Sequence, residues 1–368
     1  MAAIGMADAL NKKPQADGPA RGIWLANTLE QVQQGLDALA VVEGPADVEI
    51  EVCCAASRPD ASKVDCLVVD ESHHLIAASW FEIAAEASGR VFGFSATPWM
   101  NPERDAELVA FFGGMENFLV ISREEVLEGG HLANGRVVMH DIDERGEFDA
   151  IIEERAAPEI LERCWKFRGL WGRQQGISVP STWMFKGETK FEISVSAKID
   201  HERFVRFAET QKIVQANEKR NAHAVSLAQA GILAGRSVLI LIGSIEHGAL
   251  IQSRVAGSVM VYSKIGAKKR REAIGDFKSG KCFCLISSSL ADEGLDVPIA
   301  SELILLGGGR SAAKMEQRTG RVMRPYDGKS EGVVHDYVDA GAKFAFAQAR
   351  AREKTYKNLG YEINKIKC

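Results

Sequence analysis

Short runs of apolar residues, each bounded by polar residues or glycine, recur along the chain and are separated by stretches with helical spacing. Such runs are typical of strands buried on both faces, and the stretches between them are typical of crossover helices in a parallel sheet. The pattern occurs twice, so it predicts two α/β domains. The runs are Gly22–Leu25, Cys66–Val69, Val91–Phe94, Val238–Ile242, Phe283–Ile286 and Leu303–Leu306.

The stretch between the two predicted domains has a different character. Residues 149–164 and 201–230 have helical patterns, whereas residues 165–195 show no clear period. That segment is rich in aromatic and basic residues, which would suit base stacking and phosphate contacts. A small satellite core that fixes the linker explains it equally simply and is slightly favoured. Its tryptophans are Trp165, Trp171 and Trp183.

These patterns predict four regions along the chain. Residues 1–148 form a first domain and residues 149–210 form a linker or insert. Residues 211–345 form a second domain, and residues 346–368 form a basic C-terminal helix, which either packs on that domain or reaches a polyanion.

The composition supports a globular protein with an uneven distribution of charge. Of 368 residues, 46% are hydrophobic and 26% are charged. Residues 1–150 carry a net charge of −16 and residues 151–368 carry +11, so a polyanion is expected to contact mainly the second half. A solvated charged surface is the plainer explanation. No apolar run predicts a membrane span and no signal peptide is evident, so a cytoplasmic location is expected.

The cysteines do not follow a recognised framework. There are seven, and no two are spaced as Cys-x-x-Cys. The odd number and the irregular spacing argue against a disulfide scaffold and against a structural zinc site. All seven are therefore expected to be packing or surface residues.

The strongest local signal for chemistry is the segment from Cys66 to His74, in which an apolar strand ends at Asp70 and Glu71. A carboxylate at the end of a strand can hold Mg²⁺ through water, because Mg²⁺ prefers oxygen ligands and keeps several waters. The adjacent Glu71 can act as a general base on an attacking water. Alone this signal is weak, because acidic residues often end strands.

Three further segments strengthen it by their order. The first is Ser95-Ala96-Thr97-Pro98, which follows the next strand and by itself would suit a turn or a helix N-cap. The second runs from Ser287 to Pro298, and the third is Gln317-Arg-Thr-Gly-Arg-Val-Met-Arg324. Arg321 and Arg324 are three apart and would share a helix face. Guanidinium groups there can stabilise charge on a γ-phosphate.

Together these segments resemble the ordered motifs of superfamily 2 helicases, and the resemblance covers nearly the whole chain except about residues 130–200. It is closest to the DExH (DEAH-box) branch of phage UvsW-like and type III restriction-like helicases. The matching segments are 22–31 for motif Ia, Asp70-Glu71-Ser72-His73 for motif II, Ser95-Ala96-Thr97 for motif III, 238–247 for motif IV, Gly294-Leu-Asp-Val-Pro298 for motif V and Gln317–Arg324 for motif VI.

The resemblance implies two tandem RecA-like domains that bind ATP and Mg²⁺ between them. Asp70 would bind the metal through water, Glu71 would activate the hydrolytic water, and His73 would tie this site to a neighbouring element. The other implied roles are coupling by Ser95 and Thr97, nucleotide binding by Gly294 and Asp296, completion of the phosphate site by Gln317, Arg321 and Arg324, and contact with the nucleic-acid backbone by Thr28, Ser244 and Ser288, the last standing where the family usually has threonine.

One element of the resemblance is missing from the sequence. The family uses a phosphate-binding loop, GxxxxGK[ST], whose backbone N–H groups and lysine hold the phosphates, and no such pattern occurs here. Residues 1–10 resemble the helix that follows this loop. The chain is therefore expected to be truncated after the loop, with its first domain lacking the strand that leads into it. An upstream fragment or a partner would then supply the loop.

Three functions remain open on the sequence alone. The first is an ATP-dependent DNA helicase or translocase, which is a nucleoside-triphosphate hydrolase. The second is a catalytically silent nucleic-acid-binding subunit, favoured by the absent loop. The third is an RNA helicase. The phage-like character favours DNA over RNA as the partner.

Overall fold

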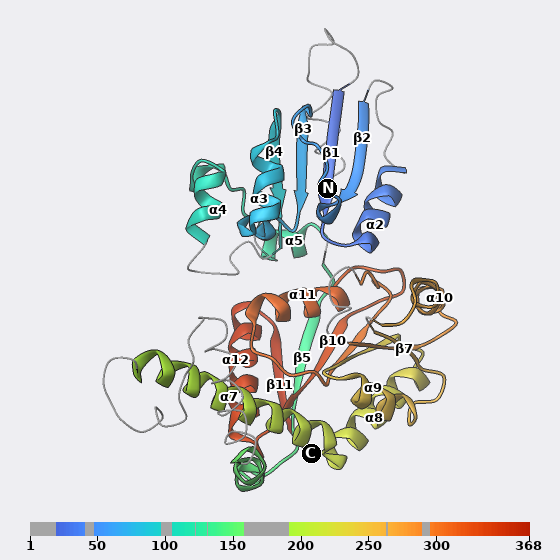
Figure 1. The fold of residues 1–368 in the computed structure, drawn as a ribbon. Coiled ribbons are helices and arrows are strands. Elements are labelled where there is room, and N and C mark those ends of the chain that lie inside the picture. Colours follow the sequence, from blue (N-terminus) through green and yellow to red (C-terminus); the bar gives the residue numbers. More distant parts are fainter. Residues whose placement is uncertain are drawn as a thin grey trace. The chain divides into compact units, whose positions relative to one another are not determined.

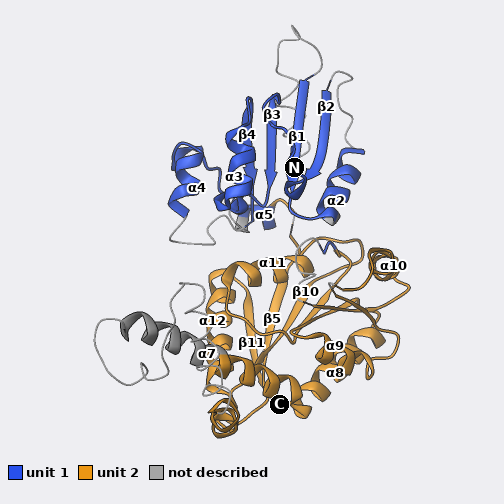
Figure 2. Cartoon of the chain, viewed as in Figure 1, with its two compact units in different colours: residues 1–128, 292–296 blue, residues 129–291, 297–368 orange. Residues whose placement is uncertain are grey.

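The computed structural model contains two compact units, each built on a parallel sheet (Figures 1 and 2). The first unit comprises residues 1–128 with 292–296, and the second comprises residues 129–291 with 297–368. The fold is α/β throughout, which confirms the predicted class. The structure describes residues 20–40, 48–96, 105–121, 123–130, 132–157, 191–262, 264–288 and 295–368.

The first unit contains a four-stranded sheet in the order β2-β1-β3-β4, with all pairs parallel. The core is formed by the apolar faces of β1 and β3 against the short helices that follow β3. The elements are β1 (Ala20–Ala26), α2 (Leu29–Ala40), β2 (Val48–Cys54), η1 (Ala55–Ser57), β3 (Cys66–Asp70), η2 (Ser72–Ile76), α3 (Ala78–Ala85), β4 (Arg90–Phe94), α4 (Asp105–Phe111), η3 (Met115–Asn117) and α5 (Arg123–Glu128).

The second unit contains a seven-stranded parallel sheet in the order β11-β5-β10-β9-β6-β8-β7. The interior strand β6 is buried along its whole length, as expected for a sheet covered on both faces. The elements are β5 (Gly135–Asp141), α7 (Phe191–Ala216), α8 (Glu218–Leu233), β6 (Val238–Ile242), α9 (Ile245–Gln252), β7 (Val259–Val261), α10 (Ala267–Lys278), β8 (Cys284–Ser288), β9 (Glu302–Leu305), α11 (Ala312–Val322), β10 (Gly332–Val338), α12 (Lys343–Asn358) and β11 (Glu362–Lys367).

The strand order reverses between β6 and β9. From β6 the chain passes through α9 towards β7 and β8, whereas from β9 it passes through α11 to β10 on the other side. In open parallel sheets, ligands bind at the carboxyl ends of the strands beside such a reversal. The end of β6 and the end of β9 are therefore the place to look for a site in the second unit.

The boundary between the units differs from the predicted one at residue 148. Strand β5 lies before that position but pairs with β10 and β11 of the second unit. These long-range pairings place residues 129–148 in the second unit. The aromatic and basic segment of the predicted insert lies largely outside the described residues.

The predicted basic helix at residues 346–368 is wrong for its last part. Helix α12 ends at Asn358, and Gly360 then adopts a φ of +71°, which turns the chain out of the helix. Residues 362–367 form strand β11, which pairs in parallel with β5. Four of the six residues of β11 are polar, including Lys365 and Lys367, which is compatible with an edge strand.

Candidate active site

Asp70 and Glu71 lie at the carboxyl end of β3, where the chain turns sharply. Asp70 is half-buried, and burial raises the pKa of its carboxyl group, while a hydrogen bond from the Glu71 backbone N–H (N···Oδ1 3.0 Å) partly opposes that shift. Glu71 has φ 53° and ψ 55°. A non-glycine residue in this left-handed region costs roughly 1–3 kcal/mol, and such residues concentrate at functional sites.

Glu71, His73 and Ser95 form one hydrogen-bonded cluster. His73 Nδ1 lies 3.0 Å from Ser95 Oγ, and the Ser95 hydroxyl donates to Glu71 Oε2 at 3.4 Å. Burial, followed by repulsion from His74, lowers the pKa of His73 to about 4, although the Glu71 carboxylate is only 3.4 Å away. The imidazole is therefore neutral near pH 7. Its Nδ1–H can donate to Ser95, which in turn donates to Glu71.

Strand pairing explains why these side chains meet. Asp70 is the register partner of Phe94, so the residues that follow each strand are also neighbours. Gly93 makes the close approach possible, because a Cβ at this position would lie 2.7 Å from the Cβ of Ser72. The cluster thus joins the end of β3 to the end of β4. Thr97, the other residue predicted to couple the two, lies outside the described residues.

The site residues predicted between 288 and 321 lie on β8, on α11 and in the segment between these elements. Ser288 ends β8 and is 6% exposed, and its hydroxyl makes no hydrogen bond to the described residues. Asp296 is partly buried further along the chain, while Gly294 lies outside the described residues. Gln317 and Arg321 lie on α11, where Arg321 is buried.

The expectation that Arg321 and Arg324 share a helix face is wrong. Helix α11 ends at Val322 and Met323 caps it, so Arg324 lies beyond the helix and is exposed. The Arg324 carbonyl accepts a hydrogen bond from Lys329 Nζ at 2.9 Å. The two guanidinium groups therefore occupy different environments.

Comparisons with known proteins agree with this combination of fold and motifs. Two family models match, "Type III restriction enzyme, res subunit" over residues 49–100 and "Helicase conserved C-terminal domain" over residues 224–326. The first covers Asp70, Glu71 and Ser95, and the second covers α11. The chain belongs to superfamily 2 of the helicases. Within this superfamily of helicases and ATPases, it falls in the restriction-like branch.

Similar proteins include two archaeal or viral relatives and one solved structure. A protein named as a helicase from Sulfolobus islandicus filamentous virus is 45% identical over 78 residues, which are 21% of this chain and 14% of that protein. DNA 3'-5' translocase XPB2 of Sulfurisphaera tokodaii is 31% identical over 94 residues, 26% of this chain and 21% of that protein. The chain thus spans only part of these relatives.

The solved structure of S. cerevisiae Dbp5 bound to RNA and ADP BeF3 aligns with a TM-score of 0.58 at 13% identity, covering 99% of this chain and 82% of that one. This likeness concerns the fold, and it matches the tandem RecA-like arrangement of the helicase family. Among the described residues, no helix combines the length and the apolar character needed to cross a lipid bilayer.

Two residues that the family resemblance assigned to nucleic acid are helix N-caps in this helicase. Thr28 Oγ1 accepts from the Gln31 backbone N–H at 3.2 Å, and Gln31 Oε1 accepts from the Thr28 N–H at 3.0 Å, which is a capping box at the start of α2. Ser244 accepts from the His247 N–H at 3.2 Å at the start of α9 and donates to Gln215 Oε1 at 2.7 Å. Both hydroxyls thus mark helix N-termini, which favour anions.

A large cavity, which the sequence did not predict, opens at the strand-order reversal of the second unit. Its volume is about 1020 Å³, and it lies at the ends of β6 and β9. Ser244 and Ser311, the N-caps of α9 and α11, both line it. The charged side chains in its wall are Lys212, Glu246, Arg310, Lys314 and Arg318. Four cationic groups against one carboxylate suit a polyanion.

Glycines shape the wall of this cavity. A Cβ on Gly307 would lie 3.1 Å from the Ile242 backbone carbon, and one on Gly308 would lie 3.1 Å from Gln348 Oε1. Gly309 has a φ of +132°. Side chains at these positions would crowd the end of β6, so the three glycines let the loop after β9 lie close to it. The run Gly307–Gly309 was the available sequence signal.

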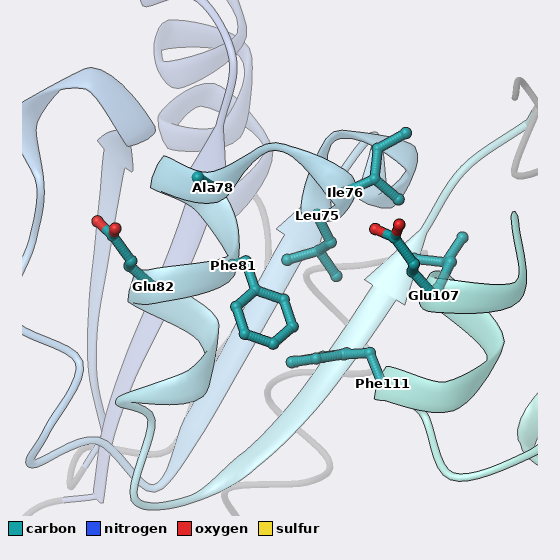
Figure 3. Close-up of a pocket in the computed structure, with 8 residues that line it drawn as sticks. Leu75, Ile76, Ala78, Phe81, Glu82, Glu107 and Phe111 are labelled. Atoms are coloured by element: carbon teal, nitrogen blue, oxygen red, sulfur yellow. The ribbon is translucent and has the colours of Figure 1, made fainter. Parts of the chain in front are cut away.

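A smaller hollow in the first unit lies beside η2 (Figure 3). Its volume is about 320 Å³, and Phe81 and Phe111 line it with ring centroids 5.6 Å apart. The carboxylates of Glu82 and Glu107 stand on either side of it. An apolar hollow with two acidic groups is unsuited to a nucleotide phosphate, so we do not assign it to the ATPase site.

One Gly-Lys-Ser tripeptide occurs, at residues 328–330, but it is not a phosphate loop. Met323 stands where the first glycine of the pattern would be. The tripeptide follows helix α11 instead of a strand. Lys329 Nζ is also engaged, because it donates to the carbonyls of Pro298 (3.0 Å) and Arg324 (2.9 Å).

Proposed function

We propose that this chain is the motor core of an ATP-dependent helicase or translocase that moves on DNA. The observation that carries the proposal is the cluster of Glu71, His73 and Ser95 beside Asp70. A carboxylate poised as a general base, with a neutral imidazole and a hydroxyl connecting it to the next strand, suits hydrolysis coupled to movement. DNA is preferred because XPB2, one of the similar proteins, is named as a DNA translocase.

In this proposal the predicted site residues divide the ATPase chemistry among them. Glu71 accepts the proton of the attacking water, and Ser95 and Thr97 relay the state of the site to the rest of the motor. Gly294 and Asp296 contribute to binding of the nucleotide. Gln317, Arg321 and Arg324 stabilise the negative charge that develops on the γ-phosphate.

The environment of Asp70 fits a magnesium ion. Burial raises the pKa of its carboxyl group, and a cation beside it would oppose that cost. A carboxylate is the ligand type that Mg²⁺ prefers, and the ion would be held through water. When bound with ATP, Mg²⁺ would neutralise charge on the phosphate oxygens.

We propose that a phosphate loop reaches the site from an upstream segment or a partner chain. Strand β4 supports this, because among the described strands it pairs with β3 alone. Phe92 and Phe94 on this edge are 37% and 36% exposed. Edges of parallel sheets are normally covered, and an apolar one offers a template for another strand.

The decisive experiment is nucleic-acid-stimulated ATP hydrolysis by two proteins. One is residues 1–368, and the other is extended upstream in its reading frame to include a Gly-Lys-Ser or Gly-Lys-Thr loop. We expect turnover only from the extended protein. Equal turnover by both would refute the need for the loop. If the reading frame contains no loop and residues 1–368 bind DNA without hydrolysis, the alternative of a silent nucleic-acid-binding subunit is correct.

The cavity of the second unit is proposed to hold the nucleic-acid backbone. Replacing Arg310 and Lys314 together with alanine should weaken binding of single-stranded DNA. The binding constant K falls as salt rises, and each lost phosphate contact reduces the magnitude of the slope of log K against log salt by about 0.7. The magnitude of this slope should therefore be about 1.4 smaller in the double variant. Fluorescence anisotropy over a salt series measures this slope.

A charge-matched control is Lys278→Ala with Lys281→Ala. These exposed residues precede β8, at the amino end of the sheet, and Lys281 keeps only a long contact of 3.8 Å with Asp276. Equal loss of slope in both double variants would show that charge alone, and not the cavity, governs binding. RNA in place of DNA in the same titration tests the third function, an RNA helicase, because preferential RNA binding would favour it.

A further inference from the structure

Three potential metal ligands, none of which was assigned to ATP or nucleic acid, meet at the carboxyl end of β5. His140 lies near the end of β5, His223 lies on α8, and Cys368 follows β11. One ligand atom from each lies within 4.8 Å of the others. His140 is buried and the other two are half-buried. Among the described residues, this is the one such group that contains both histidine and cysteine.

The hydrogen-bond pattern orients the two imidazoles towards the sulfur. His140 Nδ1 lies 3.7 Å and His223 Nε2 lies 3.4 Å from Cys368 Sγ. The other nitrogen of each ring is already engaged, since His140 Nε2 lies 3.0 Å from His335 Nδ1 and His223 Nδ1 lies 3.1 Å from the Tyr337 hydroxyl. Ligating histidines characteristically have their second nitrogen held in this way.

The spacing also fits a tetrahedral ion. With Zn–S near 2.3 Å and Zn–N near 2.0 Å, tetrahedral angles place sulfur and nitrogen about 3.5 Å apart. The two observed S···N distances of 3.4 and 3.7 Å lie on either side of that value. Nitrogen and sulfur donors select zinc over magnesium or calcium, which prefer oxygen.

We propose that His140 Nδ1, His223 Nε2 and Cys368 Sγ bind one zinc ion. Binding converts the thiol into a thiolate and releases its proton to solvent, with no change in oxidation state. The fourth position is left to water. The backbone of Cys368 is fixed beside the end of β5, because its N–H donates to the Asp141 carbonyl at 2.9 Å.

The ion would join three segments that are far apart in the sequence. It would tie the end of β11 and helix α8 to β5, and thereby stabilise an edge of the second unit. The site is independent of the proposed ATPase, so it stands even if no nucleotide is hydrolysed. The sequence could not reveal it, because its ligands show no short spacing of the kind that marks zinc motifs.

The test uses the purified full chain, exposed to zinc and dialysed, with metal content measured by mass spectrometry. We expect one zinc per chain and less than a tenth of that in Cys368→Ser. Cobalt in place of zinc should give a sulfur-to-metal absorption band that the same variant lacks. The control is Cys54→Ser, a half-buried cysteine of the first unit. Zinc should raise the melting midpoint of the wild-type second unit by about 5 °C.

Two outcomes overturn the proposal. One is a wild-type chain that retains no zinc after dialysis, and the other is a Cys368→Ser variant with unchanged zinc content. If the variant does not fold, alkylation of the wild-type chain still tests the proposal. Zinc is then expected to slow alkylation of Cys368 at least 10-fold relative to alkylation of Cys54. Unchanged alkylation in the presence of zinc would show that the thiol is not a ligand.

Discussion

Replacing Glu71 with glutamine is expected to lower nucleic-acid-stimulated ATP hydrolysis by 10²-fold or more in the chain that carries a phosphate loop. General-base catalysis typically contributes about 10²–10⁴ to a rate. Glutamine keeps the size of the side chain and an oxygen that can accept from Ser95, so the turn should persist while the base is lost. Steady-state ATPase assays measure the rate, and binding of a fluorescent ATP analogue should change little.

The matched control is Glu82→Gln, which removes one carboxylate of the same unit beside the apolar hollow of Figure 3. It should retain the wild-type rate. A Glu71→Gln chain that hydrolyses ATP within three-fold of wild type would exclude Glu71 as the base. Loss of activity in both variants would instead point to general destabilisation of the first unit.

Replacing Arg352 with methionine is expected to lower the free energy of unfolding of the second unit by about 3–5 kcal/mol, because it removes one partner of a buried ion pair. Arg352 is 4% exposed and Asp336 is 1% exposed. The guanidinium donates to both carboxylate oxygens at 2.8 and 3.0 Å. It also donates to the carbonyls of Gly309 and Tyr337, each at 3.0 Å.

The control is Arg350→Met, two residues earlier on α12. Arg350 is 63% exposed in its side chain and meets Glu353 at 3.6 Å, and exposed pairs contribute about 0–1 kcal/mol. Denaturant unfolding followed by circular dichroism compares the two variants. Equal losses would show that the buried pair contributes no more than a surface contact. Because Arg352 also holds Gly309, its variant should additionally weaken nucleic-acid binding at the cavity.

The sequence predicted those strands whose apolar residues are continuous. Each of the six predicted runs coincides with a strand, namely β1, β3, β4, β6, β8 or β9. Strand β10 was missed because His335 and Asp336 interrupt its apolar run, although both are buried. Asp336 is tolerated there because Arg352 and Tyr356 reach it from α12, and these partners cannot be identified from a local pattern.

A helix boundary was missed for a similar reason. Residues 201–230 were predicted as one helix, but α7 ends at Ala216 and α8 begins at Glu218. Asn217 separates them, and its side chain accepts from the Arg220 N–H at 3.1 Å while donating to Asp143. Asparagine is a good N-cap, but one polar residue inside a periodic segment is a weak signal.

One candidate site could be predicted from the sequence and the other could not. The cluster of Glu71, His73 and Ser95 was predictable because adjacent parallel strands bring their carboxyl ends together. The cavity was not, because its wall combines α7, α9, α11, α12 and the loop after β9. Thr28 and Ser244 were predicted as nucleic-acid contacts, and the structure adds that each caps a helix. Their roles toward nucleic acid remain predictions.

The position of β5 in the second sheet has a consequence for synthesis of the protein. Its neighbours are β10 and β11, so β5 emerges from the ribosome about 190 or more residues before either partner. At roughly 5–20 residues per second, both of its edges stay open for on the order of ten seconds or more. During that interval β5 has no native strand partner. A chaperone that shields such segments should therefore increase the yield of folded chain during synthesis. In refolding from denaturant all strands are present from the start, so slower removal of the denaturant should increase the yield less.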